Sequence, residues 1–170
     1  MTLPPDVRVA WREVPPGAVR REVSRSLLAE LLPGADVVSR CSACGGEHGR
    51  VRVTGVEATA SVSYAEGWAV VANSRSAGSV GVDAVPAEAT GLDNVLPGAD
   101  ARTWARVEAV LKADGRGLSV DPARVRIEPR ADDTWVGRVD DGAPYDGYDV
   151  VGPPGVVVAV AVSPGACAAR

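Results

Sequence analysis

The segment Gly155-Val156-Val157-Val158-Ala159-Val160-Ala161-Val162 is the longest uninterrupted apolar stretch of the chain. A strand without polar positions has to be covered on both faces. The stretch is far too short to span a bilayer, which takes about 20 apolar residues in a helix. It therefore predicts a buried central strand in a protein that does not insert into a membrane.

Two amphipathic helices are expected upstream of this strand. Apolar residues recur at helical spacing over residues 18–32 and 99–114. Pro33-Gly34 ends the first helix and Gly115 the second. Residues 41–49 read as a Gly-rich loop and 87–98 as irregular. Strands are expected over the apolar segments bounded by turn residues: 7–11, 51–56, 60–64, 68–72, 79–85, 125–128, 134–139 and 148–151.

This order of elements predicts an α+β protein in which a helix-plus-strands pattern occurs twice. A chain of 170 residues can bury one sizeable core or two small ones. We expect residues 1–75 and 76–170 to form two similar α+β halves with no linker between them. The active site would lie between the halves, with the metal site carried by the second.

The composition is that of an ordinary soluble protein, with 46% hydrophobic and 24% charged residues and a net charge of -4. A nucleic-acid binder would usually show a basic excess, so no nucleic-acid partner is expected. The three cysteines are an odd number and do not suggest a disulfide scaffold. Residues 1–6 lack the features of a signal peptide, which favours a cytoplasmic location.

The second helix places Trp104, Glu108 and Lys112 at successive i, i+4 positions on one face. The carboxylate suits a hard cation such as Mg²⁺, and the ammonium group suits a phosphate. The alternative is an ordinary Glu–Lys helix pair beside a core tryptophan. Asp83 ends an apolar strand, where it either begins a turn or supplies a second carboxylate. Mg²⁺ takes one or two carboxylates, so Asp83 with Glu108 would suffice if the fold brings them together.

The segment containing Cys41, Cys44 and His48 allows three interpretations. The spacing fits a zinc site with Cys167 as a fourth ligand. A Gly-rich turn could instead present His48 and Arg50 to an anion. The third interpretation is a plain surface turn with buried thiols.

The ordered set of motifs resembles the larger, surfactin-type group of the 4′-phosphopantetheinyl transferase superfamily. That group carries His/Tyr-Gly-Lys-Pro, then Ser-His-Ser, then Gly-x-Asp-x-Glu, and ends with Trp-x-x-Lys-Glu-Ala-x-x-Lys and Gly-x-Gly-Leu. The resemblance covers about residues 18–120, and the tryptophan-containing segment is its specific part. The matching segments of this chain, in the same order, are His48-Gly49-Arg50, Ser63-Tyr64-Ala65, Gly81-Val82-Asp83-Ala84-Val85, Trp104-Ala105-Arg106-Val107-Glu108-Ala109-Val110-Leu111-Lys112 and Gly115-Arg116-Gly117-Leu118.

The resemblance implies a fold of two similar α/β subdomains forming a pseudo-dimer, working as a monomer. It implies that Asp83 and Glu108 hold Mg²⁺, that Glu108 helps to deprotonate a serine, and that Lys112 contacts the phosphates of coenzyme A. The residues implied at the 3′-phosphate and adenine end of coenzyme A are His48, Arg50, Ser63 and Tyr64, with Arg21 and Arg25 adding charge.

The implied reaction is Mg²⁺-dependent transfer of the 4′-phosphopantetheine arm of coenzyme A to a serine of an acyl or peptidyl carrier protein. Carrier proteins of fatty-acid, polyketide or peptide synthesis are typically acidic, and Arg102, Arg106 and Arg116 could steer one. The alternative for Arg102 and Arg106 is that they are ordinary solvated helix residues. The chain departs from the family pattern at Val85, in place of a third acid, at Val107 and Val51, in place of Lys and Pro, and at Tyr64, in place of His. Two alternatives stay open: a family member that binds coenzyme A or a carrier protein without transfer, and a zinc-stabilised interaction module.

Overall fold

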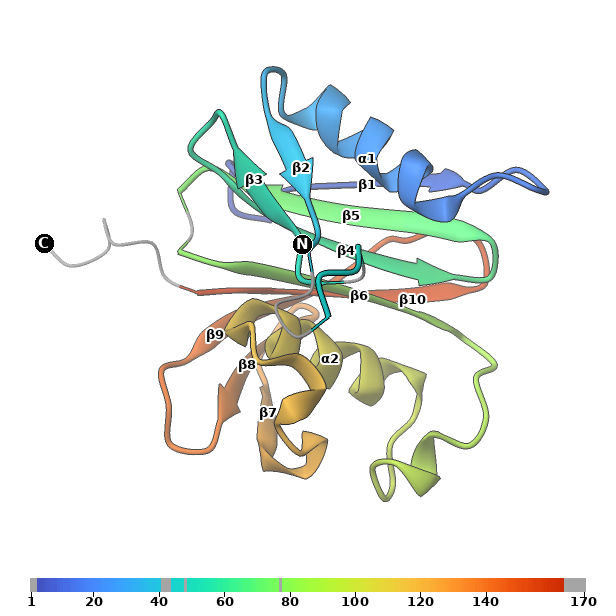
Figure 1. Ribbon diagram of the computed structural model, residues 1–170. Helices are drawn as coiled ribbons and strands as arrows, with labels where there is room; N and C mark the ends of the chain where they lie inside the picture. Colours follow the sequence, from blue (N-terminus) through green and yellow to red (C-terminus); the bar gives the residue numbers. More distant parts are fainter. Residues whose placement is uncertain (1–2, 41–43, 48, 77, 164–170) are drawn as a thin grey trace, which may run out of the picture.

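The computed structural model describes residues 3–40, 44–47, 49–76 and 78–163. These residues form a mixed α+β structure with four layers (Figure 1). Helix α1 (Arg20–Leu31) covers the outer face of one sheet, and helix α2 (Ala101–Asp114) covers the outer face of another. The two sheets lie against each other between the helices.

The first sheet has three antiparallel strands in the order β1-β5-β4. Strands β4 and β5 form the expected hairpin, in which Ala65 pairs with Trp68. Glu66 and Gly67 both adopt positive φ, as the tight hairpin turn requires. A separate pair of three-residue strands, β2 and β3, lies beside this sheet. The strands are β1 (Arg8–Glu13), β2 (Asp36–Val38), β3 (Arg52–Thr54), β4 (Thr59–Ala65) and β5 (Trp68–Ser74).

The second sheet has five antiparallel strands in the order β6-β10-β9-β8-β7. Strand β10 lies between β6 and β9, and its last five residues are buried, which confirms the buried strand expected at 156–162. The strands are β6 (Val80–Pro86), β7 (Val125–Pro129), β8 (Thr134–Val139), β9 (Tyr145–Val150) and β10 (Val156–Val162).

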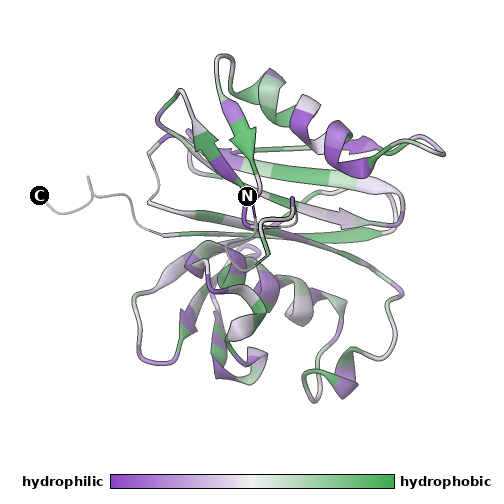
Figure 2. Cartoon of the chain, in the orientation of Figure 1, coloured by the Kyte–Doolittle hydropathy of each residue, from purple (hydrophilic) through white to green (hydrophobic). Residues whose placement is uncertain are grey.

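Three apolar cores join the four layers. On β5, Ala69 and Val71 face α1, whereas Val70 and Ala72 face the second sheet. This two-residue alternation gives β5 two buried faces. The third core lies between α2 and the second sheet and contains the fully buried Trp135. Figure 2 shows hydrophobic residues along β5 and a mixture of hydrophilic and hydrophobic residues on the amphipathic α1.

The two expected helices are confirmed. Asp100 accepts a hydrogen bond from the amide of Thr103 and caps the start of α2, and Gly115 ends the helix at φ 89°. Strand β2 was not expected. It has only three residues and one inward-facing side chain, which is too short for an alternation of apolar and polar residues to be recognised in the sequence. Irregular residues 87–98 contain a single 3-10 turn, Leu92–Asn94. None of the helices in the described residues is long and apolar enough to cross a membrane.

Candidate functional site

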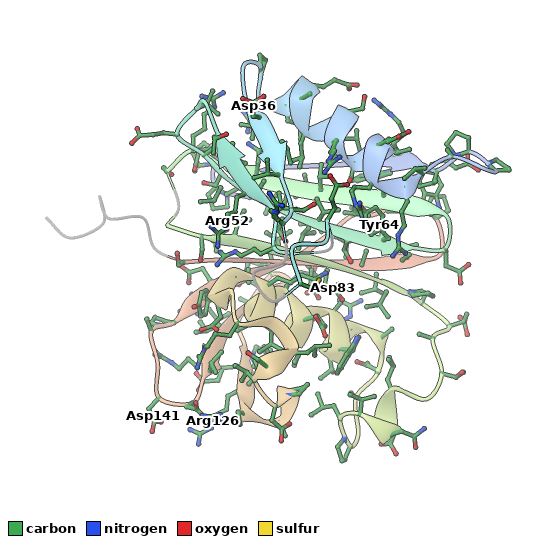
Figure 3. All side chains as sticks on the ribbon, in the orientation of Figure 1. Asp36, Arg52, Tyr64, Asp83, Arg126 and Asp141 are labelled. Carbon is green, nitrogen blue, oxygen red and sulfur yellow. The ribbon has the colours of Figure 1, made fainter. Side chains whose placement is uncertain are left out.

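Helix α2 packs unusually closely against β6, which carries Asp83. Gly81 makes this possible, because a β-carbon there would overlap the carbonyl oxygen of Ala109 and the amide nitrogen of Ala113. Side chains alternate along a strand, so Asp83 projects from the same face of β6 as Gly81, toward α2. Figure 3 shows Asp83 in the middle of the molecule, near the level where the second sheet lies on α2.

Lys112 of α2 forms an ion pair with Asp83. Its Nζ lies 2.6 Å from Oδ1 of Asp83 and donates a second hydrogen bond to the carbonyl oxygen of Val82, at 3.1 Å. Asp83 is 6% exposed. The ammonium group therefore neutralises a buried carboxylate at the boundary between the two sheets.

Glu108 lies one helical turn before Lys112 and is also buried, at 9% exposure. Burial raises the pKa of Glu108 above its ordinary value, the charge of Asp83 raises this pKa further, and Lys112 opposes both effects. The structure thus brings Asp83, Glu108 and Lys112 together. This was the condition for the magnesium site considered from the sequence. The cluster contains two carboxylates and one ammonium group, so it carries excess negative charge away from water.

The first sheet contributes to this cluster through Ser63 of β4. The hydroxyl of Ser63 donates to Oδ1 of Asp83 at 2.8 Å and accepts from the amide of Ala84 at 3.2 Å. Two residues earlier, the hydroxyl of Ser61 accepts from the amide of Val82 at 3.1 Å. Both serines are buried. The resemblance assigns Ser63 to the 3′-phosphate and adenine end of coenzyme A, and in the structure its hydroxyl is bonded to Asp83.

A cavity of about 340 Å³ opens beside Lys112, between the first sheet and the end of α2. Its basic residues are Lys112, Arg50 and Arg116. The guanidinium group of Arg50 lies against Gly115, where a β-carbon would overlap it. Two features therefore require glycine at position 115: the positive φ that ends α2, and the close approach of Arg50 to the carbonyl end of the helix.

A second cavity of about 360 Å³ adjoins the first, because both are lined by Gly49, Val51 and Val62. Tyr64 lies at this second cavity, on the α1 side of β4 (Figure 3). Its hydroxyl is hydrogen-bonded to that of Ser24 at 2.7 Å.

Three arginines of α1 line the same second cavity. The guanidinium of Arg20 stacks over the ring of Tyr64, 4.6 Å from its centre. Arg21 and Arg25 form ion pairs with Glu47, at 2.9 and 3.7 Å. Basic residues therefore line both adjoining cavities, from Lys112 to α1, and we call the two cavities together the basic channel.

The arginines expected to steer a carrier protein are paired within the chain. Arg102 and Arg106 both contact Asp149, and Arg116 contacts Asp114. Burial alone would raise the pKa of Asp149, but the bonds from Arg106 and Arg102 outweigh it and hold this pKa below its ordinary value. Trp135 adds a hydrogen bond from Nε1 to the same carboxylate, at 3.0 Å.

The proposed zinc ligands Cys41, His48 and Cys167 lie outside the described residues, as does the expected contact of His48 with an anion. Cys44 is exposed, and its sulfur accepts from the amide of Gly46. Within the described parts of the chain, no group of three or more His, Cys, Asp or Glu side chains could hold a metal.

Sequence reasoning missed the contacts that Ser61, Gly81 and Asp149 make. Ser61 and Ser63 are two residues apart on β4, and Gly81 and Asp83 are two residues apart on β6. This matching spacing is the signal from which the contact between the two strands could have been predicted. Comparison of the sequence with protein-family models and with curated proteins gives no match.

Proposed function

We propose that this protein transfers the 4′-phosphopantetheine arm of coenzyme A to a serine of an acyl or peptidyl carrier protein, in an Mg²⁺-dependent reaction. One observation carries the proposal: two buried carboxylates, Asp83 and Glu108, adjoin Lys112 at the end of a basic channel. The motif resemblance assigns the same three residues to one site.

The arrangement of strands supports the proposed pseudo-dimer fold. In each half the first strand pairs antiparallel with the last, and the last pairs with the one before it, giving β1-β5-β4 and β6-β10-β9. In each half the first helix follows the first strand. We therefore propose that residues 1–75 and 76–170 are the two related halves.

The donor set of the cluster fits Mg²⁺. Mg²⁺ binds through one or two carboxylates and completes its octahedron with water and phosphate oxygens. A divalent cation would also relieve the repulsion between Asp83 and Glu108 that raises the pKa of Glu108. Val85 projects toward α2 from the same face of β6 and is buried in the α2 core, so the position of the third family acid is apolar here.

The basic channel suits a ligand with two separate phosphate groups. Lys112, Arg50 and Arg116 would neutralise the pyrophosphate beside the carboxylates. Arg20, Arg21 and Arg25 would receive the 3′-phosphate, and the Tyr64 ring offers a stacking surface to the adenine base. An anion entering the second cavity would compete with Glu47 for Arg21 and Arg25.

In the proposed reaction the carrier-protein serine oxygen attacks the β-phosphorus of coenzyme A, and 3′,5′-ADP leaves with the electrons of the cleaved P–O bond. Glu108 accepts the serine proton as the general base of this step. Lys112 stabilises charge on the pyrophosphate oxygens. Mg²⁺, when bound, supplies further neutralisation of that charge.

The test is labelling of apo carrier proteins from fatty-acid, polyketide and peptide synthesis with a fluorescent coenzyme A in the presence of Mg²⁺. We expect labelling by the wild type and its loss in Asp83→Asn and Glu108→Gln, which preserve side-chain size. Glu88→Gln, at an exposed position, is the matched control and should label normally. A wild type that labels none of these carriers would refute the proposal.

A second function, binding without transfer, is favoured by the Lys112–Asp83 contact. The ammonium group already occupies Oδ1 of Asp83 at 2.6 Å, and Val85 offers no further ligand. A protein of this kind would bind coenzyme A in the basic channel with no Mg²⁺ requirement. Calorimetry with coenzyme A separates the two functions, since binding with no turnover supports the second and absence of binding removes both.

A further inference from the structure

The two sheets meet where the outer strand of one lies beside the outer strand of the other. Strand β4 ends the order β1-β5-β4, and strand β6 begins the order β6-β10-β9-β8-β7. No backbone ladder joins β4 to β6 among the described residues. The open edge of β6 therefore presents amide groups that need other acceptors in a buried setting.

Two serine hydroxyls supply these acceptors. Ser61 accepts from Val82 and Ser63 accepts from Ala84, so the two-residue spacing of the serines matches that of the amides. Both serines are less than 8% exposed. In this respect Ser61 and Ser63 do the same work, because each satisfies one buried amide at the edge of β6.

The two serines differ in where their hydroxyl protons go. A hydroxyl group has a single proton to donate. Ser63 donates it to Oδ1 of Asp83 at 2.8 Å. The hydroxyl of Ser61 has no comparable side-chain acceptor within the described residues.

Both hydrogen bonds to the Asp83 carboxylate fall on the same oxygen. Oδ1 accepts from Ser63 and from Lys112, at 2.8 and 2.6 Å. Oδ2 has no hydrogen-bond donor among the described residues. With two donors on one oxygen and the serine oxygen tied to the Ala84 amide, the carboxylate cannot rotate without breaking a buried bond.

We propose that Ser63 is a positioning residue that orients the Asp83 carboxylate and leaves its Oδ2 for a divalent cation. This inference rests on the proposed function for the identity of the cation. It assigns Ser63 to the metal site rather than to the adenine end of coenzyme A, in agreement with its burial and its absence from the linings of both cavities. Ser61 accepts from the Val82 amide and lines the first cavity, but among the described residues it makes no hydrogen bond to Asp83.

The test measures Mn²⁺ binding to the full chain by electron paramagnetic resonance, in the wild type and in Ser61→Ala, Ser63→Ala and Ser63→Thr. Loss of a group that orients a metal ligand lowers affinity by about 10–100-fold. We expect a loss of this size in Ser63→Ala, retention of affinity in Ser61→Ala, and rescue in Ser63→Thr, which keeps the hydroxyl. Urea unfolding should show destabilisation of both alanine variants, because each leaves one edge amide without its acceptor, and Ser63→Ala also removes the bond to Asp83.

Equal Mn²⁺ affinities in Ser61→Ala and Ser63→Ala would overturn the inference, since both serines would then be purely structural. A wild type that binds no Mn²⁺ would overturn it as well. Failure of the proposed function gives a different result. A wild type that binds Mn²⁺ but labels no carrier protein would refute transfer, while the difference between the two serine variants would still establish the role of Ser63.

Discussion

The second sheet holds two aspartates that face basic residues of α2, the buried Asp83 and the partly buried Asp149, and their surroundings differ. The carboxylate of Asp149 on β9 accepts hydrogen bonds from Arg102, Arg106 and Trp135, and its pKa is lowered. The carboxylate of Asp83 on β6 accepts hydrogen bonds from Lys112 and Ser63, and it lies near a second carboxylate, that of Glu108.

The balance of charges distinguishes the structural ion pair at Asp149 from the candidate reaction site at Asp83. At Asp149 two guanidinium groups surround one carboxylate, so the positive charge is in excess and the acid is fully satisfied. At Asp83 two carboxylates share one ammonium group, so a negative charge remains in a buried place. Buried charge without full compensation is costly, and it persists where a ligand can supply the compensation.

The largest expected effect comes from removing the uncompensated acid. Glu108→Gln should reduce carrier-protein labelling by about 10²–10⁴-fold, because it removes the proposed base and a metal ligand. Its stability in urea should equal or exceed that of the wild type, because the repulsion with Asp83 disappears. Labelling rates and urea unfolding of the same preparation check both outcomes, and a large loss of stability in Glu108→Gln would contradict the comparison.

Removing the compensated acid should have the opposite effect. Asp149→Ala leaves Arg106, whose side chain is 16% exposed, and the indole nitrogen of Trp135 without their shared hydrogen-bond acceptor. We expect a loss of about 3 kcal/mol in the free energy of unfolding, as for other broken buried pairs. Glu30→Ala is the matched control, because its bidentate contact with Arg12 is exposed and should matter little. Similar unfolding midpoints for Asp149→Ala and the wild type would argue against a structural role.

Adding a third acid at Val85 would sharpen the comparison. Val85→Asp should lower the free energy of unfolding by about 1–3 kcal/mol in chelator, because it buries a further polar group. Mg²⁺ should restore part of that loss, since the new carboxylate would join Asp83 and Glu108. Val139→Asp, at an equally buried valine of the same core, should be destabilised without rescue. Equal responses of the two variants to Mg²⁺ would place the cation elsewhere.

The smallest expected effect is on the pH dependence of stability. The pKa of Glu108 is raised in the folded protein, so the folded state keeps this proton to higher pH than the unfolded chain. Its contribution to stability therefore declines as the pH rises from the ordinary value of 4.5 through the folded pKa. Asp149 has a lowered pKa, so its contribution declines as the pH falls below 3.8.

Urea unfolding of the wild type, Glu108→Gln and Asp149→Asn over a pH series separates the two contributions. The difference between the wild type and Glu108→Gln should grow above pH 4.5, and Asp149→Asn should flatten the acid limb. Parallel curves for all three proteins would show that neither acid titrates as proposed.

The sequence alone determined both helices, the hairpin at Glu66-Gly67 and the buried strand at 156–162. It also placed Glu108 and Lys112 on one face of α2. These features depend on local patterns, because side-chain spacing along a helix or strand is set by backbone geometry within a few residues.

Only the tertiary structure decided which partners the polar residues take. Ser63 contacts Asp83 twenty residues away because two sheet edges meet, and Gly81 sets how near α2 comes. Arg102 and Arg106, for which the sequence allowed either a partner protein or solvent, form ion pairs with Asp149 of a distant strand. Such contacts join segments whose separation along the chain has no fixed relation to their distance in space, so packing between layers, rather than periodicity, determines them.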